Sequence, residues 1–357
     1  MRGVKRKILA IAAAASMAIS ATSSFAAEPG QAGLPPAFAK PLKLKFCIFD
    51  PLGTYGDAYS NARDMALEAK KWNMEIELKL YPDERVAAED FKAGQCEGVG
   101  LSTLRAKQFN KFMGSIDSIG SIPTYDHMRT VLQTLANPKV IPLTISGPYQ
   151  VIGTIPLGAA YIFVNDKKIN SVEGAAGKKV AVLEWDTSQQ QLVHQMGATP
   201  VNSDITNFAN KFNNGQVDII AAPAIAYKPL EIYKGLGEKG GIFRFPVVMI
   251  TGSVVINRDK LLKEVPDLDQ RMVGLRDFAF TQIERVFAII DKSEQEIDSK
   301  YWMDLAQKDK DRYTLLMRES RIQLTKQGYY DPKMMSILKR VRCMKSPGNA
   351  ECSLNDE

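Results

Sequence analysis

A ten-residue frame occurs twice in this chain, and no other feature of the sequence limits the fold as strongly. The copies are Phe91 to Gly100 and Phe212 to Ala221, which share the pattern Phe-x-x-Gly-Gln-x-acid followed by small or apolar residues. In each copy we expect the glycine to end a helix, because glycine adopts positive φ without strain. A buried strand should follow within a few residues.

The residues before each copy repeat in the same order. The first half predicts strand, helix, strand and short helix at 44–50, 56–72, 75–80 and 88–93. The second half predicts the same series at 179–184, 188–196, from 199, and 205–213. This alternation is typical of parallel sheets with helices on both faces, so two α/β lobes are expected. The length of 357 residues agrees with two domains.

Two apolar segments, 151–165 and 245–256, are interpreted as crossover strands between the lobes. Lobe 2 (154–249) is then an insertion in lobe 1 (42–153 plus 250–290). Helical spacing of apolar residues predicts C-terminal helices at 268–297, 311–327 and 332–341. Residues 291–357 are expected to form C-terminal helices and a disulfide loop.

The first 26 residues have the features of a Sec-type signal peptide. The basic residues Arg2, Lys5, Arg6 and Lys7 precede an apolar run, Ile8 to Ser20, and Ser24-Phe25-Ala26 provides a cleavage site. The alternative is a membrane anchor, but the run is shorter than the ~20 residues that a span needs. We expect residues 1–26 to be removed and residues 27–41 to form a disordered lead. The mature chain should be periplasmic, without stable membrane insertion.

Charge and composition narrow the possible functions. The net charge of +6 loses four positive charges with the signal peptide and falls to +2, which gives no reason to expect a nucleic-acid partner. Only two histidines are present, so a multi-histidine metal site is excluded, and no metal or other cofactor is predicted. The chain has no Gly-x-Ser-x-Gly elbow, Walker loop or His-Glu-x-x-His motif, and we do not expect an enzyme.

Four cysteines, Cys47, Cys96, Cys343 and Cys352, lie in the mature part. An exported chain with an even number of cysteines favours two disulfides, for which three pairings exist. Cys343 and Cys352 flank a Pro-Gly turn, so we expect them to pair, which leaves Cys47 for Cys96. A zinc site is the alternative, but the spacings match no zinc pattern.

Several segments resemble a family of solute-binding proteins that are often labelled components of resistance-nodulation-division efflux pumps. The family is related to the periplasmic solute-binding proteins of tripartite ATP-independent periplasmic (TRAP) transporters. The resemblance extends over about 43–357 and is carried by the segments 46–53, 83–96, 163–170, 176–184 and 207–218. It implies a two-lobe periplasmic-binding-protein-like α/β fold of the type II, TRAP-like kind, with C-terminal helices. The pump label itself does not fit this sequence. An inner-membrane pump needs many membrane spans, and no apolar stretch after residue 26 reaches that length.

The chain departs from the wider TRAP class at one position. Those proteins usually carry an arginine, in a Gly-x-Lys-x-Arg frame, that pairs with the carboxylate of an organic acid. Here the frame runs from Gly177 to Ala181, and alanine stands in place of that arginine. A carboxylate ligand is therefore in doubt.

Ligands of open α/β sheets bind beyond the carboxyl ends of strands, which indicates candidate binding residues here. They are aromatic, acidic, basic and hydroxyl side chains: Asp50, Tyr55, Tyr81, Arg85, Ser102, Arg105, Tyr161, Glu184, Trp185, Asp186 and Tyr227. The set suits a polar or zwitterionic molecule with an apolar body. Structural roles are the alternative, with Asp50 and Asp186 as helix caps and Arg85 and Arg105 in ion pairs.

Three functions from different classes remain. The favoured one is an exported binding protein that captures a small solute in a cleft between the lobes and delivers it to membrane transporter subunits. The alternative is a periplasmic adaptor or shuttle of an envelope efflux or lipid-export complex, which predicts an exposed apolar patch. A hydrolase on the same fold is the third.

Overall fold

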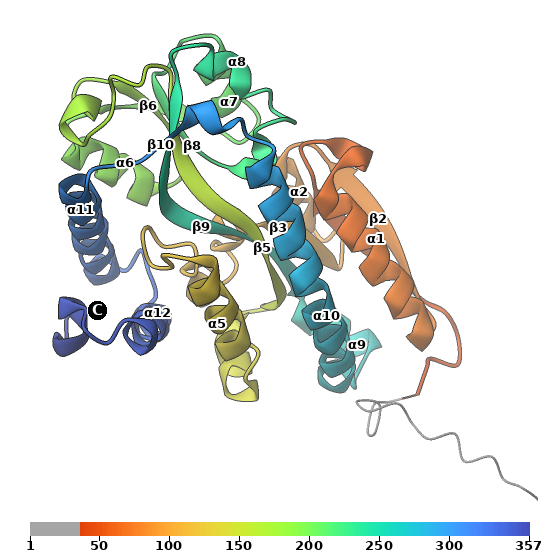
Figure 1. Cartoon of the computed structure of the whole chain (residues 1–357). Helices are drawn as coiled ribbons and strands as arrows, with labels where there is room; N and C mark the ends of the chain where they lie inside the picture. The colour runs from red at the N-terminus through yellow and green to blue at the C-terminus, as the bar shows by residue number, and fades with distance from the viewer. Residues whose placement is uncertain (1–35) are drawn as a thin grey trace, which may run out of the picture. The chain divides into compact units, whose positions relative to one another are not determined.

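The computed structural model describes residues 36–357, and a ten-stranded sheet forms its centre (Figure 1). The predicted signal peptide and residues 27–35 of the predicted lead lie outside the described residues. The strands are β1 (Leu42–Phe49), β2 (Met74–Tyr81), β3 (Gly98–Ser102), β4 (Ile145–Ser146), β5 (Tyr149–Val164), β6 (Lys179–Leu183), β7 (Thr199–Ser203), β8 (Ile219–Pro223), β9 (Gly241–Asn257) and β10 (Trp302–Met303).

Within the sheet the strand order is β2-β1-β3-β9-β5-β8-β6-β7. At one end β1 pairs in parallel with β2 and β3, and at the other β6 pairs in parallel with β7 and β8. The predicted parallel units are therefore present. The two apolar crossover segments form β5 and β9, which pair antiparallel with each other between these units. The sheet is mixed as a result, with antiparallel pairing at its centre.

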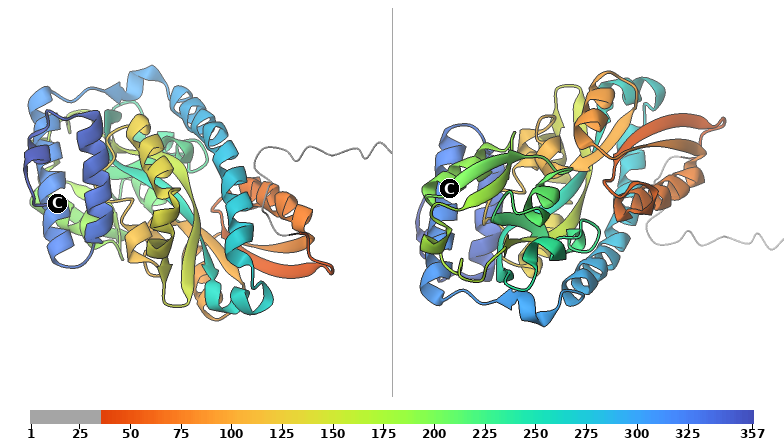
Figure 2. Two further views of the ribbon diagram at one scale, coloured as in Figure 1. Left: turned by 90° about the horizontal axis from the view of Figure 1, so that it is seen from below. Right: turned by 90° about the horizontal axis from the view of Figure 1, so that it is seen from above.

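The longer helices cover the sheet and extend to the C-terminus. They are α1 (Asp57–Ala69), α2 (Glu84–Lys92), α5 (Tyr125–Leu135), α6 (Thr187–Gln195), α7 (Phe208–Asn213), α9 (Arg258–Glu264), α10 (Leu268–Gln295), α11 (Gln307–Lys326) and α12 (Pro332–Lys345). Three four-residue helices are α3 (Thr103–Ala106), α4 (Lys111–Gly114) and α8 (Tyr233–Leu236). Helix α10 packs on β5 and beside α1, whereas α11 packs on α6 and α12 on α5 (Figures 1 and 2).

The repeated sequence frame gives the same backbone in both copies. Gly94 has φ of 78° and Gly215 has φ of 69°, and each follows the end of a helix, α2 or α7. The next strand begins four residues after each glycine, at Gly98 and Ile219. The predicted helix-glycine-strand arrangement is confirmed, because only glycine takes this left-handed conformation at no steric cost.

Both disulfides join the predicted cysteine pairs. Cys47, in β1, is bonded to Cys96, just before β3, and both are buried. Cys343, in α12, is bonded to Cys352, and between them Glu351 accepts hydrogen bonds of 2.8 Å from Nε and Nη2 of Arg342. The first disulfide stabilises the sheet, and the second holds the last loop against α12.

Candidate functional site

A cavity of about 470 Å³ lies between the sheet and its helices, and residues from both ends of the sheet line it. Leu44, Ile48 and Leu78 belong to the β1–β2 end, whereas Leu183 and Phe208 belong to the β6–β8 end. The central strands β5 and β9 contribute side chains along its length. Its volume falls within the range of small-molecule sites in proteins.

Regular spacing shows which surfaces form the walls of the cavity. Every second residue from Leu44 to Ile48 in β1 and from Met74 to Leu78 in β2 faces it, so one face of the sheet forms one wall. On α10, lining residues recur every three or four positions from Leu268 to Ala279, and Val286, Ile289 and Ile290 follow about two turns further along. The lined part of β1, from Leu44 to Phe49, is about 17 Å long at ~3.3 Å per residue. The cavity is therefore an elongated slot between the sheet, α1 and α10.

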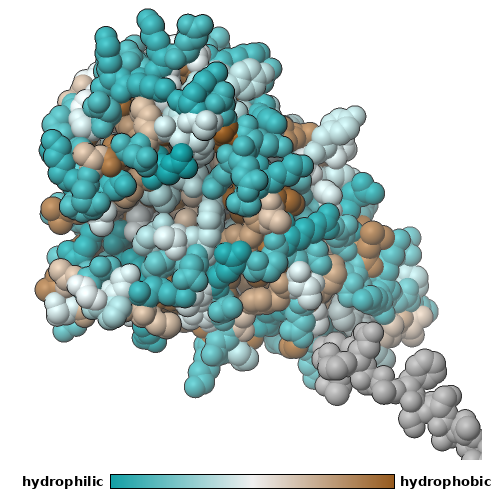
Figure 3. All heavy atoms as spheres, viewed as in Figure 1, coloured by the Kyte–Doolittle hydropathy of each residue, from teal (hydrophilic) through white to brown (hydrophobic). Residues whose placement is uncertain are grey.

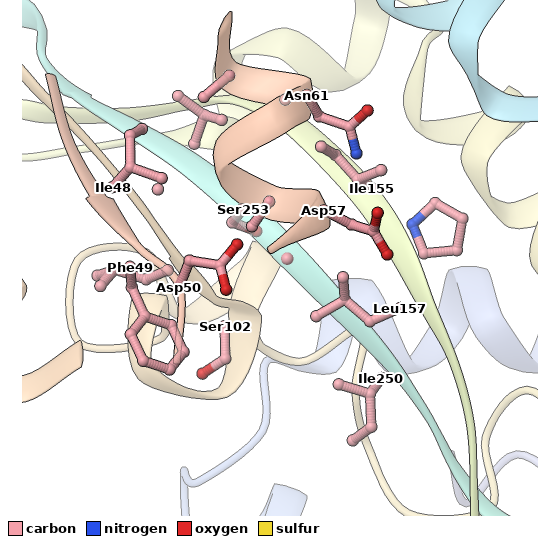
Figure 4. Close-up of a pocket in the computed structure, with 18 of the residues that line it drawn as sticks. Ile48, Phe49, Asp50, Asp57, Asn61, Ser102, Ile155, Leu157, Ile250 and Ser253 are labelled. Carbon is pink, nitrogen blue, oxygen red and sulfur yellow. The ribbon is translucent and has the colours of Figure 1, made fainter. Parts of the chain in front are cut away.

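Polar side chains gather where β1 and β3 end (Figure 4). Asp50 follows β1, Asp57 begins α1, and Ser102 ends β3. The carboxylate of Asp50 is 2% exposed and accepts hydrogen bonds of 3.0 Å from the backbone N–H groups of Leu52 and Tyr59. Asp57 is solvent-exposed and lines the cavity. Figure 4 shows Leu157, Ile155 and Ile250 beside these groups.

No lysine, arginine or histidine is among the described residues that line the cavity. Ala181, the position at which the wider TRAP class usually carries arginine, does line it. Asp50 and Asp57 are the charged members of the lining, and Asn61, Ser102, Gln189 and Ser253 are the uncharged polar ones. The cavity is thus an apolar slot with an acidic end.

The predicted binding residues divide into two groups in the structure. Asp50 and Ser102 line the cavity, and the other nine are not among its lining residues. Tyr55 is 95% exposed, Glu184 is exposed, and Arg85 forms a surface ion pair with Asp83 at 3.7 Å. A role for these three residues in ligand contact stays a prediction.

Several of the other predicted residues are engaged with internal partners. The hydroxyl of Tyr81 donates to Asp90 at 2.5 Å, and that of Tyr161 donates to Glu294 at 2.8 Å. Tyr227 is buried and stacks on Phe163. These contacts fix the three tyrosines within the protein.

Asp186 caps helix α6, as the structural alternative expected. Its carboxylate accepts from the backbone N–H groups of Ser188 and Gln189, at 2.9 and 3.4 Å, and from the hydroxyl of Tyr329 at 2.9 Å. Tyr329 lies in the loop between α11 and α12. This contact ties the C-terminal helices to the β6 end of the sheet.

A polar bridge, made by Glu84, Arg105 and Trp185, joins the two ends of the sheet. The guanidinium of Arg105 lies 4.2 Å from the ring centroid of Trp185, and its Nε donates to Glu84 at 3.3 Å. Burial raises the pKa of Glu84, although Ser102 and Arg105 act against that shift. The indole Nε1 of Trp185 is buried without a hydrogen-bond partner in the described part of the chain. Arg105 therefore has the structural ion pair that the alternative interpretation expected, and it also contacts the other end of the sheet.

Two further ionisable groups, Asp117 and Lys107, have shifted pKa values and were not predicted. Burial raises the pKa of Asp117 to about 7, and hydrogen bonds from the N–H and hydroxyl of Thr251 in β9 act against the rise. Burial lowers the pKa of Lys107 to about 7, and its Nζ lies 3.2 Å from the ring centroid of Tyr329. The sequence did not indicate that these two residues are buried, because single charged residues in loops are usually exposed.

The raised pKa of Asp117 predicts a pH dependence of stability. The folded chain holds a proton that the unfolded chain, with an ordinary aspartate pKa near 4, releases, so the free energy of unfolding should fall as pH rises from about 4 to about 7. Lys107, with its pKa lowered to about 7, keeps its proton in both states up to about pH 6 and adds nothing to the slope below that pH. Asp117→Asn should remove part of the fall, which thermal melts at pH 4.5 and 6 will measure. If the melting temperature fell by the same amount between the two pH values in wild type and variant, Asp117 would not be the group that causes the pH dependence.

Comparisons with known proteins now identify the family. A family model described as "Solute-binding protein AdeT 1/2" matches residues 64–357. The chain belongs to the AdeT 1/2 solute-binding family. The curated "Probable solute-binding protein AdeT1" of Acinetobacter baumannii is 46% identical to it over 310 residues, which cover 87% of this chain and 100% of that protein. "Probable solute-binding protein AdeT2" of the same organism is 29% identical, over 68% of this chain and 100% of its own.

Solved structures with a fold similar to that of this chain are TRAP periplasmic solute-binding proteins. A TRAP periplasmic solute-binding protein of Ralstonia eutropha H16, with bound (S)-2-acetolactate, has a TM-score of 0.70 at 12% identity, covering 85% of this chain and 99% of that one. One of Desulfovibrio desulfuricans, with bound sn-glycerol-3-phosphate, has a TM-score of 0.69 at 14% identity, covering 87% and 100%. The predicted two-lobe TRAP-like fold and the family resemblance are confirmed.

The AdeT 1/2 family is a binding family, and the chain is a solute-binding protein. Across residues 36–357, no helix combines the length and hydrophobicity that crossing a membrane requires. In the same range, no group of three or more His, Cys, Asp or Glu side chains is placed to hold a metal ion. The cavity with its acidic end is therefore the candidate binding site.

Proposed function

We propose that the chain is exported to the periplasm, captures an apolar small molecule in the elongated slot and delivers it to a membrane transporter. The observation that carries this proposal is the lining of the cavity, which is apolar along its length and draws on both ends of the sheet. Burial of apolar ligand surface stabilises a complex by about 25 cal/mol per Å². An elongated apolar molecule would therefore gain most from this site.

The chemistry of the lining favours this ligand class over organic acids. An organic acid needs hydrogen-bond donors or a cation at its carboxylate, and the TRAP class usually supplies an arginine. Ala181 stands at that position here, and Asp50 and Asp57 would repel an anion. The two related structures hold (S)-2-acetolactate and sn-glycerol-3-phosphate, which are both acidic, so the ligand proposed for this chain differs in class from theirs.

Capture would involve bending of the two long central strands. The pairing of β5 with β9 shifts register at four places between Val151 and Phe163. Such irregularities bend strands locally, and Gly153 and Pro156 beside them line the slot. Opening at these points would admit a ligand, and closing would bring Trp185 onto Arg105.

A binding role fits the site better than catalysis. Enzymatic acid–base or nucleophilic chemistry needs a reactive group beside a second group that activates it. The described lining offers two carboxylates and no histidine, cysteine or lysine, and the carboxylate of Asp50 already accepts hydrogen bonds from two backbone N–H groups. We propose that the chain releases its ligand unchanged.

The surface agrees with an internal site. Figure 3 shows a mostly hydrophilic face, with hydrophobic residues in small separate groups. An adaptor for apolar cargo would instead present a broad apolar patch to its partner. The proposal therefore places the apolar contact inside the slot.

Native mass spectrometry tests this function. The chain is isolated from the periplasm without refolding, and its mass is recorded before and after addition of 1-N-phenylnaphthylamine, a neutral apolar dye. We expect a single noncovalent adduct per chain, either a co-purified apolar molecule or one dye. Absence of any adduct under both conditions would overturn the proposal.

A further inference from the structure

The acidic end of the slot has a defined place in the fold. Asp50 and Ser102 stand at the carboxyl ends of neighbouring strands, and Asp57 and Asn61 lie one turn apart on the face of α1 that lines the slot. Figure 4 shows these side chains around the same end of the pocket, with Ile155, Leu157 and Ile250 beside them. A ligand that fills the slot must therefore present some group to two carboxylates.

Asp50 occupies a position that would otherwise attract anions. The N-terminus of a helix offers free backbone N–H groups and a positive partial charge. In α1 the backbone N–H of Tyr59 donates a hydrogen bond of 3.0 Å to the carboxylate of Asp50, and Asp57 lies in the first turn. Gly56 allows this close approach, because a Cβ there would meet the carboxylate oxygens of Asp50 at 1.9 Å. The protein's own carboxylates thus take the place of a ligand anion.

The acidic end also lacks a cationic partner within the described chain. Asp57 forms no hydrogen bond or ion pair with another described side chain, and no basic side chain lines the slot. Carboxylates beside an apolar, partly enclosed space interact more strongly with a cation than they would in water. Hydrogen-bond donors on a positive group would match Asp57 and the remaining lone pairs of Asp50.

We infer that the slot selects apolar amines, with the protonated amine held at Asp50 and Asp57 and the apolar body lying between α1, α10 and the sheet. This inference rests on the proposed capture of an apolar solute in the slot and adds the chemical class of its polar end. An alcohol with the same apolar body would make the same apolar contacts but no ion pair. A carboxylate would be repelled by Asp50 and Asp57.

A matched series of ligands tests the inference. Decylamine, 1-decanol and decanoate share one chain and differ only at the head, and each is measured by displacement of bound 1-N-phenylnaphthylamine at neutral pH. We expect decylamine to bind at least about tenfold more tightly than decanol, and decanoate more weakly than either. Equal binding of decylamine and decanol would overturn the inference while leaving capture intact. No dye binding and no displacement by any of the three would instead refute the capture on which it rests.

Variants on α1 locate the selectivity. Asp57→Asn should reduce the preference for decylamine over decanol several-fold, because one of the two carboxylates that pair with the amine is removed. Asn61→Asp adds a carboxylate one turn further along the slot and should raise the preference. Asp64→Asn is the control, because Asp64 is on the same helix, pairs with Arg285 at 2.9 Å and does not line the slot. An amine preference that none of these variants changes would overturn the assignment, since a purely structural role at the helix N-terminus leaves the amine-to-alcohol ratio constant.

Discussion

Replacing Ala181 with tryptophan is expected to reduce the affinity for 1-N-phenylnaphthylamine by at least about a hundredfold. Ala181 is half-buried in β6 and lines the slot, so the added indole ring should occupy space that the ligand needs. Loss of most of the buried apolar contact of a small ligand is worth several kcal/mol, and 1.4 kcal/mol corresponds to a factor of ten. A fluorescence titration measures the effect.

Ala93→Trp is the matched control for this variant. Ala93 is exposed at the end of α2 and is absent from the lining, so dye binding should keep its wild-type affinity. Thermal melts of both variants show whether each remains folded. If the dye bound a folded Ala181→Trp chain as tightly as wild type, the ligand would lie outside the slot.

Removal of the Cys47–Cys96 disulfide should cause the largest loss of stability among simple covalent changes. The two cysteines are 49 residues apart, and a cross-link of that span stabilises the folded chain by about 4 kcal/mol through the entropy of the unfolded state. Both cysteines are buried, so the Cys47→Ala/Cys96→Ala double variant also loses core contacts. The midpoint of urea unfolding measures the change.

The second disulfide provides an internal comparison. Cys343 and Cys352 are only 9 residues apart, which gives about 2.6 kcal/mol by the same relation. Their side chains are half-buried, so Cys343→Ala/Cys352→Ala should shift the midpoint less. If removal of the second disulfide lowered the urea midpoint more than removal of the first, loop length and burial would not explain the relative contributions of the two disulfides to stability.

Local sequence signals predicted most of the fold. The glycines of the repeated frame placed the starts of β3 and β8, and Asp331-Pro332 begins α12 with an aspartate cap and a proline in the first turn. These signals act over a few residues, and glycine, proline and capping side chains have restricted roles there. The repeated order of strands and helices predicted two α/β lobes, and the family resemblance added the TRAP-like type of the fold.

Of the predicted binding residues, Asp50 and Ser102 line the cavity, and ligand contact by the others stays a prediction. Tyr161 and Arg105 were chosen because they are polar residues near strand ends, but each found a partner inside the protein. The partner of Tyr161 is Glu294, 133 residues further along, and that of Arg105 is Glu84, 21 residues earlier. Such pairings depend on tertiary packing and leave no periodic trace in the sequence.

The sequence also did not reveal that an apolar cavity lies beside the sheet. Leu44 and Met74 alternate with polar residues along β1 and β2, as any core-facing residue does. Sequence alternation shows that a face is covered, but the fit of the covering helix decides whether a cavity remains. Here the space between that face, α1 and α10 became visible only in the structure.

Native mass spectrometry of the wild-type chain beside Ala181→Trp tests the central claim most directly. The claim is that the elongated slot holds one apolar molecule, and the account predicts one adduct per wild-type chain and none on the variant. An adduct of equal abundance on both chains, or no adduct on the wild type with the dye in excess, would contradict it.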